Sequence, residues 1–259
     1  MSDPLDMTGK AVVVTGGSSG VGWGIATRFF EAGADVVICD LKEPAELPAD
    51  GEREVAFVQA DLRDVEQIER VVRFTRERFG RLDVLVNNVG GAPPADAATA
   101  SPRFSEAIIR LNLLVPLHFS QKANAVMQEQ EEGGVIINIA SVSAIRPSPG
   151  TAAYAAAKAG LLSLTQTLAV EWAPKVRVNA VTAGMIQTEL AALHYGDAEG
   201  LAAVAASVPL GRMGLPRDVA DVCLFLTSPL ASYVSGAGIL MHGGGEKPAF
   251  LAAAKGTKP

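Results

Sequence analysis

A tyrosine and a lysine separated by three alanines form the part of this sequence best suited to chemistry. Tyr154 and Lys158 are four residues apart, so a helix would place both side chains on one face. A phenol has an ordinary pKa of about 10 and is a poor base at neutral pH. An ammonium group one turn away would lower that pKa, and Ser141, thirteen residues upstream, could hold a substrate oxygen beside the phenol. The three residues predict a proton-transfer centre for an alcohol or a carbonyl, although the pair alone leaves a packed aromatic and a solvated amine as the alternative.

The elements that must position these residues are strands and helices in alternation. Apolar, mostly β-branched runs predict strands at 12–14, 36–38, 57–58, 84–86, 135–137, 176–181 and 239–241. Helical patterns lie between them, at 21–32, 64–79, 102–130, 154–173 and 217–227. Such alternation is typical of a parallel sheet covered on both faces. We therefore predict an α/β fold: a single Rossmann-like domain over 1–259, with a doubly wound parallel sheet of about seven strands.

Two segments interrupt this alternation of strands and helices. Residues 185–212 carry no strand pattern, and we expect this insertion to cover the substrate, because long insertions in compact domains are often lids. It contains His194 and Tyr195, which we leave out of the predicted site because a lid histidine without a partner is usually a surface or packing residue. The role of the tail at 246–259 cannot be read from the sequence.

A glycine-rich turn joins the first predicted strand to the first predicted helix. Glycines there let the backbone approach a pyrophosphate, and the helix N-terminus supplies free N–H groups. The order strand, turn and helix is the context that makes this motif specific. The turn residues expected to bind a dinucleotide are Gly16, Ser18, Ser19, Gly20, Val21 and Gly22.

Asp40 closes the second predicted strand, 18 residues beyond Gly22. A carboxylate at this position can accept from both ribose hydroxyls and repels a 2′-phosphate, so NAD is favoured over NADP. Lys42 could reach toward a phosphate, and a strand-end carboxylate in an ordinary turn is the alternative for Asp40. Ligands of open α/β sheets bind at the carboxyl ends of strands. The cofactor positions predicted at those ends are Leu41, Asp61, Leu62, Asn88 and Gly90.

With these residues assembled, the chain resembles the short-chain dehydrogenase/reductase family from Lys10 to about Gly245. The resemblance rests on motifs in register: the Gly16/Gly20/Gly22 turn, Asp40, Asp61-Leu62, Asn87-Asn88-Val89-Gly90, Asn112, Ser141, Tyr154 and Lys158. It implies hydride transfer between a substrate carbon and a nicotinamide, without a metal.

The resemblance also implies a role for each residue. Tyr154 would be the general acid/base, and Lys158 would lower the pKa of the phenol and hold the nicotinamide ribose. Ser141 would orient the substrate oxygen, and Asn112 would anchor a water relay from Lys158. Ile186 would flank the nicotinamide carboxamide, and Thr188 lies where a hydroxyl contact with the cofactor is expected. Two departures, Ala183 in place of a proline and Val89 in place of an alanine, put only the details of nicotinamide placement in doubt.

The expected substrate is a hydrophobic secondary alcohol or ketone, steroid-like or similar to a 3-hydroxyacyl-CoA. Residues 91–94, 142–150 and 185–212 should face it, and they are mostly small or apolar. The side chains expected to contact it are Ser143, Ile145, Met185 and Leu190. Core packing is the competing explanation for about half of the apolar side chains. Arg146 could meet a carboxylate or a coenzyme A phosphate, or be a solvated surface arginine.

Other functions remain as alternatives. One is a 3-oxoacyl thioester reductase of fatty-acid-type metabolism, and another is a non-catalytic dinucleotide-binding sensor. An acyl-carrier-protein substrate is disfavoured, because the run Gln128-Glu129-Gln130-Glu131-Glu132 would repel an acidic carrier. A nucleotide-sugar epimerase or dehydratase is disfavoured because such relatives usually run longer and add a C-terminal substrate domain.

Composition sets limits on partners and location. A net charge of −6 without a Lys/Arg cluster gives no reason to expect nucleic acid. Cys39 and Cys223 form neither a disulfide framework nor a metal-ligand spacing. With no targeting signal and no membrane-length apolar stretch, a cytoplasmic protein is expected. Small residues of the predicted helix at 154–173 suggest a homodimer or homotetramer, with burial inside the subunit as the alternative: Ala155, Ala159, Gly160 and Ser163.

Overall fold

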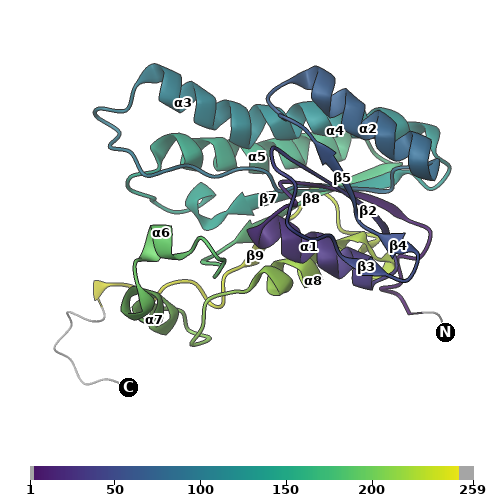
Figure 1. Cartoon of the computed structure of the whole chain (residues 1–259). Coiled ribbons are helices and arrows are strands. Elements are labelled where there is room, and N and C mark those ends of the chain that lie inside the picture. Colours follow the sequence, from purple (N-terminus) through teal and green to yellow (C-terminus); the bar gives the residue numbers. More distant parts are fainter. Residues whose placement is uncertain (1–2, 251–259) are drawn as a thin grey trace.

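A seven-stranded parallel sheet forms the centre of the computed structural model, which describes residues 3–250 apart from the side chain of His194. Its strand order is β5-β2-β1-β6-β7-β8-β9, and every neighbouring pair is parallel (Figure 1). The strands are β1 (Ala11–Thr15), β2 (Asp35–Asp40), β5 (Ala56–Gln59), β6 (Val84–Asn87), β7 (Gly134–Ser141), β8 (Val176–Ala183) and β9 (Gly238–Met241). The predicted Rossmann-like α/β fold is confirmed, and each predicted strand is present.

Helices cover both faces of the sheet. In Figure 1, α2, α4 and α5 lie on one side of the strands, and α1 and α8 lie on the other. The long helices are α1 (Gly20–Glu31), α2 (Val65–Phe79), α4 (Val115–Glu129), α5 (Ala152–Glu171) and α8 (Pro216–Thr227). Shorter ones are α3 (Pro102–Ile109), α6 (Ala192–Tyr195) and α7 (Ala198–Ser207). None of the helices within 3–250 is long and apolar enough to cross a membrane.

The alternation of side chains along the strands builds two hydrophobic cores. Val12 and Val14 of β1 point into the core shared with α1 and α8. Val13, between them, points into the core on the other face, where α2 and α4 contribute Ile68 and Phe119. Because successive strand residues face opposite sides, both faces of a central strand must be apolar. This explains why the strand runs are apolar throughout.

Three local features were not predicted. A two-stranded hairpin of β3 (Ala49–Asp50) and β4 (Arg53–Glu54) follows β2. The helix predicted over 102–130 is divided into α3 and α4 by a π-helical turn at Arg110–Leu114. The insertion at 185–212 contains two short helices, α6 and α7.

The carboxyl ends of all seven strands meet at one edge of the sheet, because the strands run parallel. At this edge the strand order reverses between β1 and β6, so the connections leave the sheet in opposite directions and open a crevice. The glycine-rich turn follows β1, Asp40 ends β2, and Ser141 ends β7. The fold therefore gathers residues that are distant in sequence at a single edge.

Candidate active site

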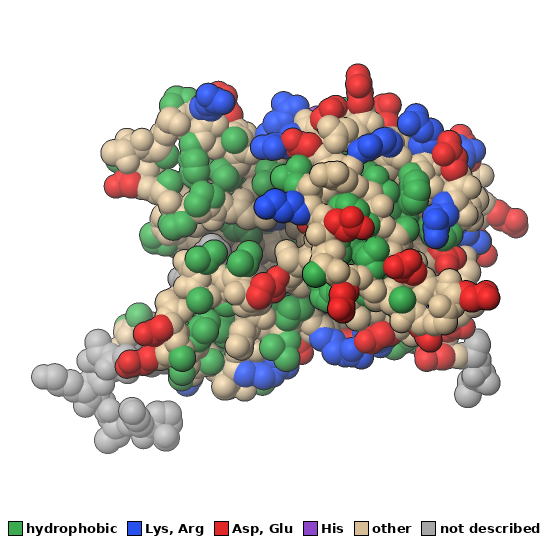
Figure 2. Space-filling model, viewed as in Figure 1, with side chains coloured by type: hydrophobic (Ala, Val, Ile, Leu, Met, Phe, Trp, Pro, Cys, Tyr) green, Lys and Arg blue, Asp and Glu red, His purple; other side chains and the backbone are tan. Residues whose placement is uncertain are grey.

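A pocket of about 420 Å³ opens at this carboxyl edge. Figure 2 shows the molecule hollowed between the part that contains α3 and the part that contains α6 and α7, with hydrophobic side chains on both rims. Predicted site residues that line the pocket are Gly16, Ser19, Gly20, Val21, Asp40, Asn88, Gly90, Ser141, Tyr154, Lys158, Ile186, Thr188 and Leu190. Predicted residues outside its lining are Ser18, Gly22, Leu41, Asp61, Leu62, Asn112, Ser143, Ile145 and Met185.

Lys158 is a buried ammonium group on α5. Its side chain is one turn beyond Tyr154, its exposed fraction is 3%, and Nζ donates to the backbone carbonyl of Ile139 at 2.8 Å. Burial lowers the pKa of Lys158 to about 8, because a charged amine loses hydration inside the protein. The ammonium therefore carries its charge at neutral pH at a cost to the stability of the fold.

The pKa of Tyr154 differs from the sequence-based expectation. Burial raises it, an interaction with the Ser141 hydroxyl lowers it by less, and the charge of Tyr195 raises it further. The expected lowering by Lys158 is not found: Nζ lies over the ring, 5.6 Å from its centroid, and desolvation of the phenol dominates. Tyr154 is therefore a protonated phenol at neutral pH.

Ser141 is oriented by its own turn. Its Oγ accepts from the backbone N–H of Ser143 at 3.2 Å, which leaves the hydroxyl proton able to point into the pocket. The Ser143 hydroxyl lies 3.0 Å from that of Ser148. Ser143, predicted to contact substrate, is hydrogen-bonded within the loop that follows β7.

Asn112 is fully buried in the π-helical turn between α3 and α4. Its Oδ1 accepts from the N–H of Gly91 at 2.9 Å, and its Nδ2 donates to the carbonyls of Gly91 and Ile108, both at 2.9 Å. A Cβ on Gly90 would lie 2.5 Å from Asn112 Oδ1 and 3.2 Å from Lys158 Nζ. Gly90 thus lets the backbone pass closely between the two side chains that the expected relay would join.

The glycine-rich turn has the shape and the free polar group that a dinucleotide requires. Gly16 and Gly20 have φ values of 64° and 55°, in the left-handed region that favours glycine. A Cβ on Gly22 would lie 2.1 Å from the carbonyl oxygen of Gly16, so only glycine lets the helix start so close to the turn. The buried Oγ of Ser18 has no hydrogen-bond partner among the described residues. A hydroxyl in that position fits a phosphate oxygen, so the turn is compatible with a pyrophosphate.

Two carboxylates follow strands β2 and β5. Asp40 accepts from the N–H of Leu41 at 2.7 Å and, weakly, from that of Ser18 at 3.4 Å, so it lies beside the glycine-rich turn. Asp61 forms a two-pronged ion pair with Arg63, at 2.8 Å and 2.7 Å, which holds the pKa of the carboxyl below its usual range. Asp40 therefore lines the pocket beside the turn, whereas Asp61 is held in its ion pair.

Glu189 is a site residue that the sequence did not indicate. Its Oε1 accepts from the backbone N–H of Gly20 at 2.8 Å, at the N-terminal end of α1. The neighbouring Thr188 lies over the same turn, since a Cβ on Gly20 would be 3.5 Å from its Cγ2. A carboxylate is favourable at a helix N-terminus. Only the fold reveals this contact, because 169 residues separate the two partners.

Exposed apolar side chains occur in the two segments that follow Ser141 and Ile186. Ile145 is 57% exposed, Leu190 54% and Leu193 75%. Tyr195, which the sequence analysis left out of the site, acts electrostatically on Tyr154 and raises its pKa. The side chain of His194 lies outside the described part of the chain.

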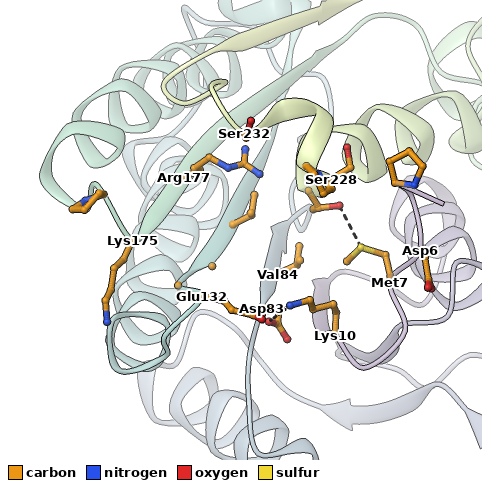
Figure 3. A pocket seen from close by; sticks show the side chains of 17 residues that line it. Asp6, Met7, Lys10, Asp83, Val84, Glu132, Lys175, Arg177, Ser228 and Ser232 are labelled. Carbon is orange, nitrogen blue, oxygen red and sulfur yellow. Dashed lines mark hydrogen bonds and ion pairs between the residues drawn. The ribbon is translucent and has the colours of Figure 1, made fainter. Parts of the chain in front are cut away.

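A second pocket, also about 420 Å³, lies at the amino ends of the strands (Figure 3). Its charged side chains already have structural partners. Lys10 lies 3.6 Å from Asp83, Lys175 donates to the carbonyl of Gln128 at 2.8 Å, and Arg177 donates to the carbonyl of Leu226 at 2.8 Å. These contacts stabilise the amino edge and the C-terminal ends of helices. Within 3–250, no group of three or more His, Cys, Asp or Glu side chains could hold a metal.

Comparison with known proteins shows similarity along nearly the whole chain. A family profile described as enoyl-(acyl carrier protein) reductase matches residues 15–246. A probable 2,4-dienoyl-CoA reductase of Bacillus subtilis (strain 168) is 38% identical over 246 residues, which cover 92% of this chain and 97% of the relative. The 3beta-hydroxysteroid dehydrogenase 1 of Eggerthella lenta is 36% identical over 250 residues, covering 92% of this chain and 94% of that protein. The solved ligand-free structure of the aldohexose dehydrogenase of Thermoplasma acidophilum has a TM-score of 0.86 at 28% identity and covers 98% of both chains.

Proposed function

Because this chain belongs to the short-chain dehydrogenase/reductase family of oxidoreductases, we propose that it interconverts a hydrophobic secondary alcohol and its ketone with NAD. One observation carries the proposal: Tyr154, Lys158 and Ser141 line the same pocket as the glycine-rich turn and Asp40. A proton-transfer group and a dinucleotide cradle therefore share one cavity, which is what oxidation of a CH–OH group requires.

The proposed roles follow from the surroundings of each side chain. Ser141 holds the substrate oxygen, and Tyr154 moves the proton at that oxygen. In reduction the phenol donates its proton, which suits a pKa raised by burial. In oxidation the phenolate must accept the substrate proton, and the raised pKa of Tyr154 means that this form is reached only at alkaline pH. Asn112 positions the backbone at Gly91, beside which we expect the water relay to pass.

The cofactor that we propose is a nicotinamide dinucleotide, which when bound supplies or accepts the hydride. The turn from Gly16 to Gly22 would hold its pyrophosphate, with the Ser18 hydroxyl as an additional donor. Asp40 would accept from the ribose hydroxyls and exclude a 2′-phosphate. Leu41, Leu62, Asn88 and Ile186 would border the rest of the binding site.

An apolar substrate is favoured by Leu190, which lines the pocket, and by the exposed Ile145 and Leu193 in the segments that carry Ser141 and Leu190. The Eggerthella lenta relative is a hydroxysteroid dehydrogenase by name, in agreement with a steroid-like alcohol. We expect Met185, in the same segment as Leu190, to contact the substrate when the segment closes.

Reduction of an acyl thioester is a second candidate. The family profile and the Bacillus subtilis relative are named for enoyl and dienoyl thioesters. The acidic run at 128–132 is a weaker argument against an acyl carrier protein than the sequence suggests, because ion pairs reduce its charge. Glu129 pairs with Arg76 at 2.9 Å, and Glu132 pairs with Arg81 at 2.8 Å.

We also propose that the protein is a cytoplasmic homodimer or homotetramer. Both cysteines are buried free thiols, which suits a reducing compartment. On α5, Gly160 packs within the subunit, since a Cβ there would lie 3.1 Å from Leu113. Ala159 and Ser163 are exposed and would allow close approach of a second copy. Sedimentation at micromolar concentration measures this association.

The substrate class is tested by the reduction of NAD⁺ with hydroxysteroids, 3-hydroxyacyl-CoAs and simple secondary alcohols in parallel, and by the oxidation of NADH with dienoyl-CoA. We expect turnover of a hydroxysteroid or another apolar secondary alcohol. Turnover of dienoyl-CoA alone would favour the second candidate. Tight binding of NADH without turnover of any of these compounds would instead favour a non-catalytic dinucleotide sensor.

A further inference from the structure

An ion pair joins the loop between Ser141 and Tyr154, two residues that line the pocket, to a segment 100 residues further along the chain. Nη2 of Arg146 contacts Oε1 of Glu246. Arg146 belongs to the loop after Ser141, and Glu246 follows β9. Both side chains are about one-third exposed, 38% for Arg146 and 34% for Glu246. Both charged groups are therefore accessible to a ligand and also partly shielded from water.

Both partners are held in place by their own segments. Hydrogen bonds from Ser143 and Thr151 to Ser148 stiffen the loop that carries Arg146. On the other side, three successive glycines at 243–245 all have positive φ, which turns the chain sharply after β9. The N–H of Lys247 contacts the carbonyl of Ser207 at the end of α7, at 3.4 Å. The residue after Glu246 thus contacts the 185–212 segment, which we expect to cover the substrate.

Tyr195 connects this ion pair to the reaction centre. It is partly buried, and its pKa responds to the charges of both Arg146 and Glu246. The same phenol acts on Tyr154. Arg146 and Glu246 therefore act electrostatically on the same phenol that acts on Tyr154. A charged substituent on a substrate bound at Tyr154 would encounter them on its way in or out.

The charge of Glu246 has two effects on such a substituent. The carboxylate pairs with the guanidinium of Arg146. Without this pairing, the guanidinium could bind a carboxylate or a phosphate through two hydrogen bonds. The carboxylate of Glu246 also places a negative charge where an anionic substituent would approach, and like charges oppose binding. A neutral substrate meets neither penalty.

From this geometry we propose that Glu246 is a specificity-determining residue, which makes the site select uncharged over anionic substrates by pairing with Arg146. This inference rests on the proposed function, because it assigns the substrate class of the same pocket. Loss of the carboxylate would convert Arg146 into a free anion partner without changing the proton-transfer residues.

The test uses the full-length protein and two pairs of matched probes. One pair is a neutral hydroxysteroid and the analogue that carries a side-chain carboxylate, compared by kcat/KM. The other pair is phenylnaphthylamine and anilinonaphthalene sulfonate, which share a ring system but differ in charge, and whose dissociation constants are measured by fluorescence in the presence of NADH. The variants are Glu246→Gln, the double variant Arg146→Gln/Glu246→Gln, and Glu199→Gln on α7 as a control for the loss of one surface charge.

We expect Glu246→Gln to improve the binding of the anionic probe relative to the neutral one by about fivefold, the upper range for an exposed charge pair. The gain should vanish in the double variant and be absent in Glu199→Gln. An unchanged ratio in Glu246→Gln, or a gain that persists without Arg146, would overturn the inference. If the dyes show the gain and neither steroid is turned over, the steroid assignment fails and the selection against anions by Glu246 stands. Turnover of a steroid without any gain in Glu246→Gln would support the proposed function and overturn the role of Glu246.

Discussion

The ammonium nitrogen of Lys158 lies 5.6 Å from the centre of the Tyr154 ring, one turn further along α5. The lysine is 3% exposed, and burial lowers its pKa from 10.5 to about 8. Each pKa unit corresponds to about 1.4 kcal/mol, so holding this charge costs the fold about 3 kcal/mol at neutral pH. A cost of this size at the pocket is consistent with a functional charge beside the phenol.

Replacement of Lys158 by methionine should therefore stabilise the protein while abolishing its activity. The folded-state pKa lies below the unfolded value, so the unfolded chain binds more protons between about pH 8 and 10.5. The destabilisation of the wild type by the buried charge is largest below pH 8 and disappears as the pH rises to 10.5. We expect the free energy of unfolding of Lys158→Met to exceed that of the wild type by about 3 kcal/mol at pH 7, and the excess to shrink across this window.

Urea denaturation of both proteins at neutral and alkaline pH measures the difference. Because the other titratable groups occur in both proteins, their contributions to the pH dependence cancel in the difference between the two unfolding free energies. A variant that is less stable than the wild type at pH 7, or a difference that does not change with pH, would contradict the assignment of a strained, buried charge to Lys158.

Asp40 should set the preference for NAD. Its carboxylate lies beside the Ser18 N–H at the mouth of the glycine-rich turn, where a 2′-phosphate would meet a like charge. We expect Asp40→Asn to lower the ratio of kcat/KM for NAD to that for NADP by about tenfold, equivalent to about 1.4 kcal/mol. Asp35→Asn is the matched control, because Asp35 begins the same strand at the opposite edge of the sheet. A ratio that stays the same in Asp40→Asn, or that falls equally in the control, would remove Asp40 from the cofactor site.

Glu189 should weaken the binding of the cofactor, because its carboxylate accepts from the Gly20 N–H that faces the expected pyrophosphate. The carboxylate must leave that N–H before the pyrophosphate can use it, and its charge repels the phosphates. We expect Glu189→Gln to lower the dissociation constant of NADH about threefold, in the range of a helix-terminal charge interaction. Calorimetry on the protein without substrate measures the change, with Glu199→Gln as the control. Weaker binding of NADH by Glu189→Gln would mean that the carboxylate supports the turn instead of competing for it.

The sequence predicted the sheet well because each strand is buried on both faces and therefore reads as a continuous apolar run. It also placed Asp40 and Asn88 at the correct edge, because parallel strands bring their carboxyl ends together. The hairpin at 49–54 was missed because its strands are two residues long and largely exposed, which leaves no hydrophobic pattern.

Other features of the site are not indicated by the hydrophobic pattern or by the motifs of the sequence. The π-helical turn at Asn112 adds a residue within a helical pattern, so the sequence shows one helix where the structure has two. The contact between Glu189 and Gly20 joins residues from opposite ends of the chain, and the pair of Arg146 and Glu246 joins segments that are 100 residues apart. The direction of the Tyr154 pKa shift depends on burial, which the spacing of Tyr154 and Lys158 does not reveal.

The most direct test of the central claim compares wild type and Tyr154→Phe in NAD⁺ reduction with the best substrate of the panel, together with NADH binding by both proteins. The phenylalanine keeps the ring beside Lys158 and removes only the hydroxyl that we propose moves the proton. We predict that kcat falls by about 100-fold or more, as expected for the loss of a general acid/base, while the dissociation constant of NADH changes by less than about twofold. Turnover by Tyr154→Phe at close to the wild-type rate would contradict the proposed mechanism.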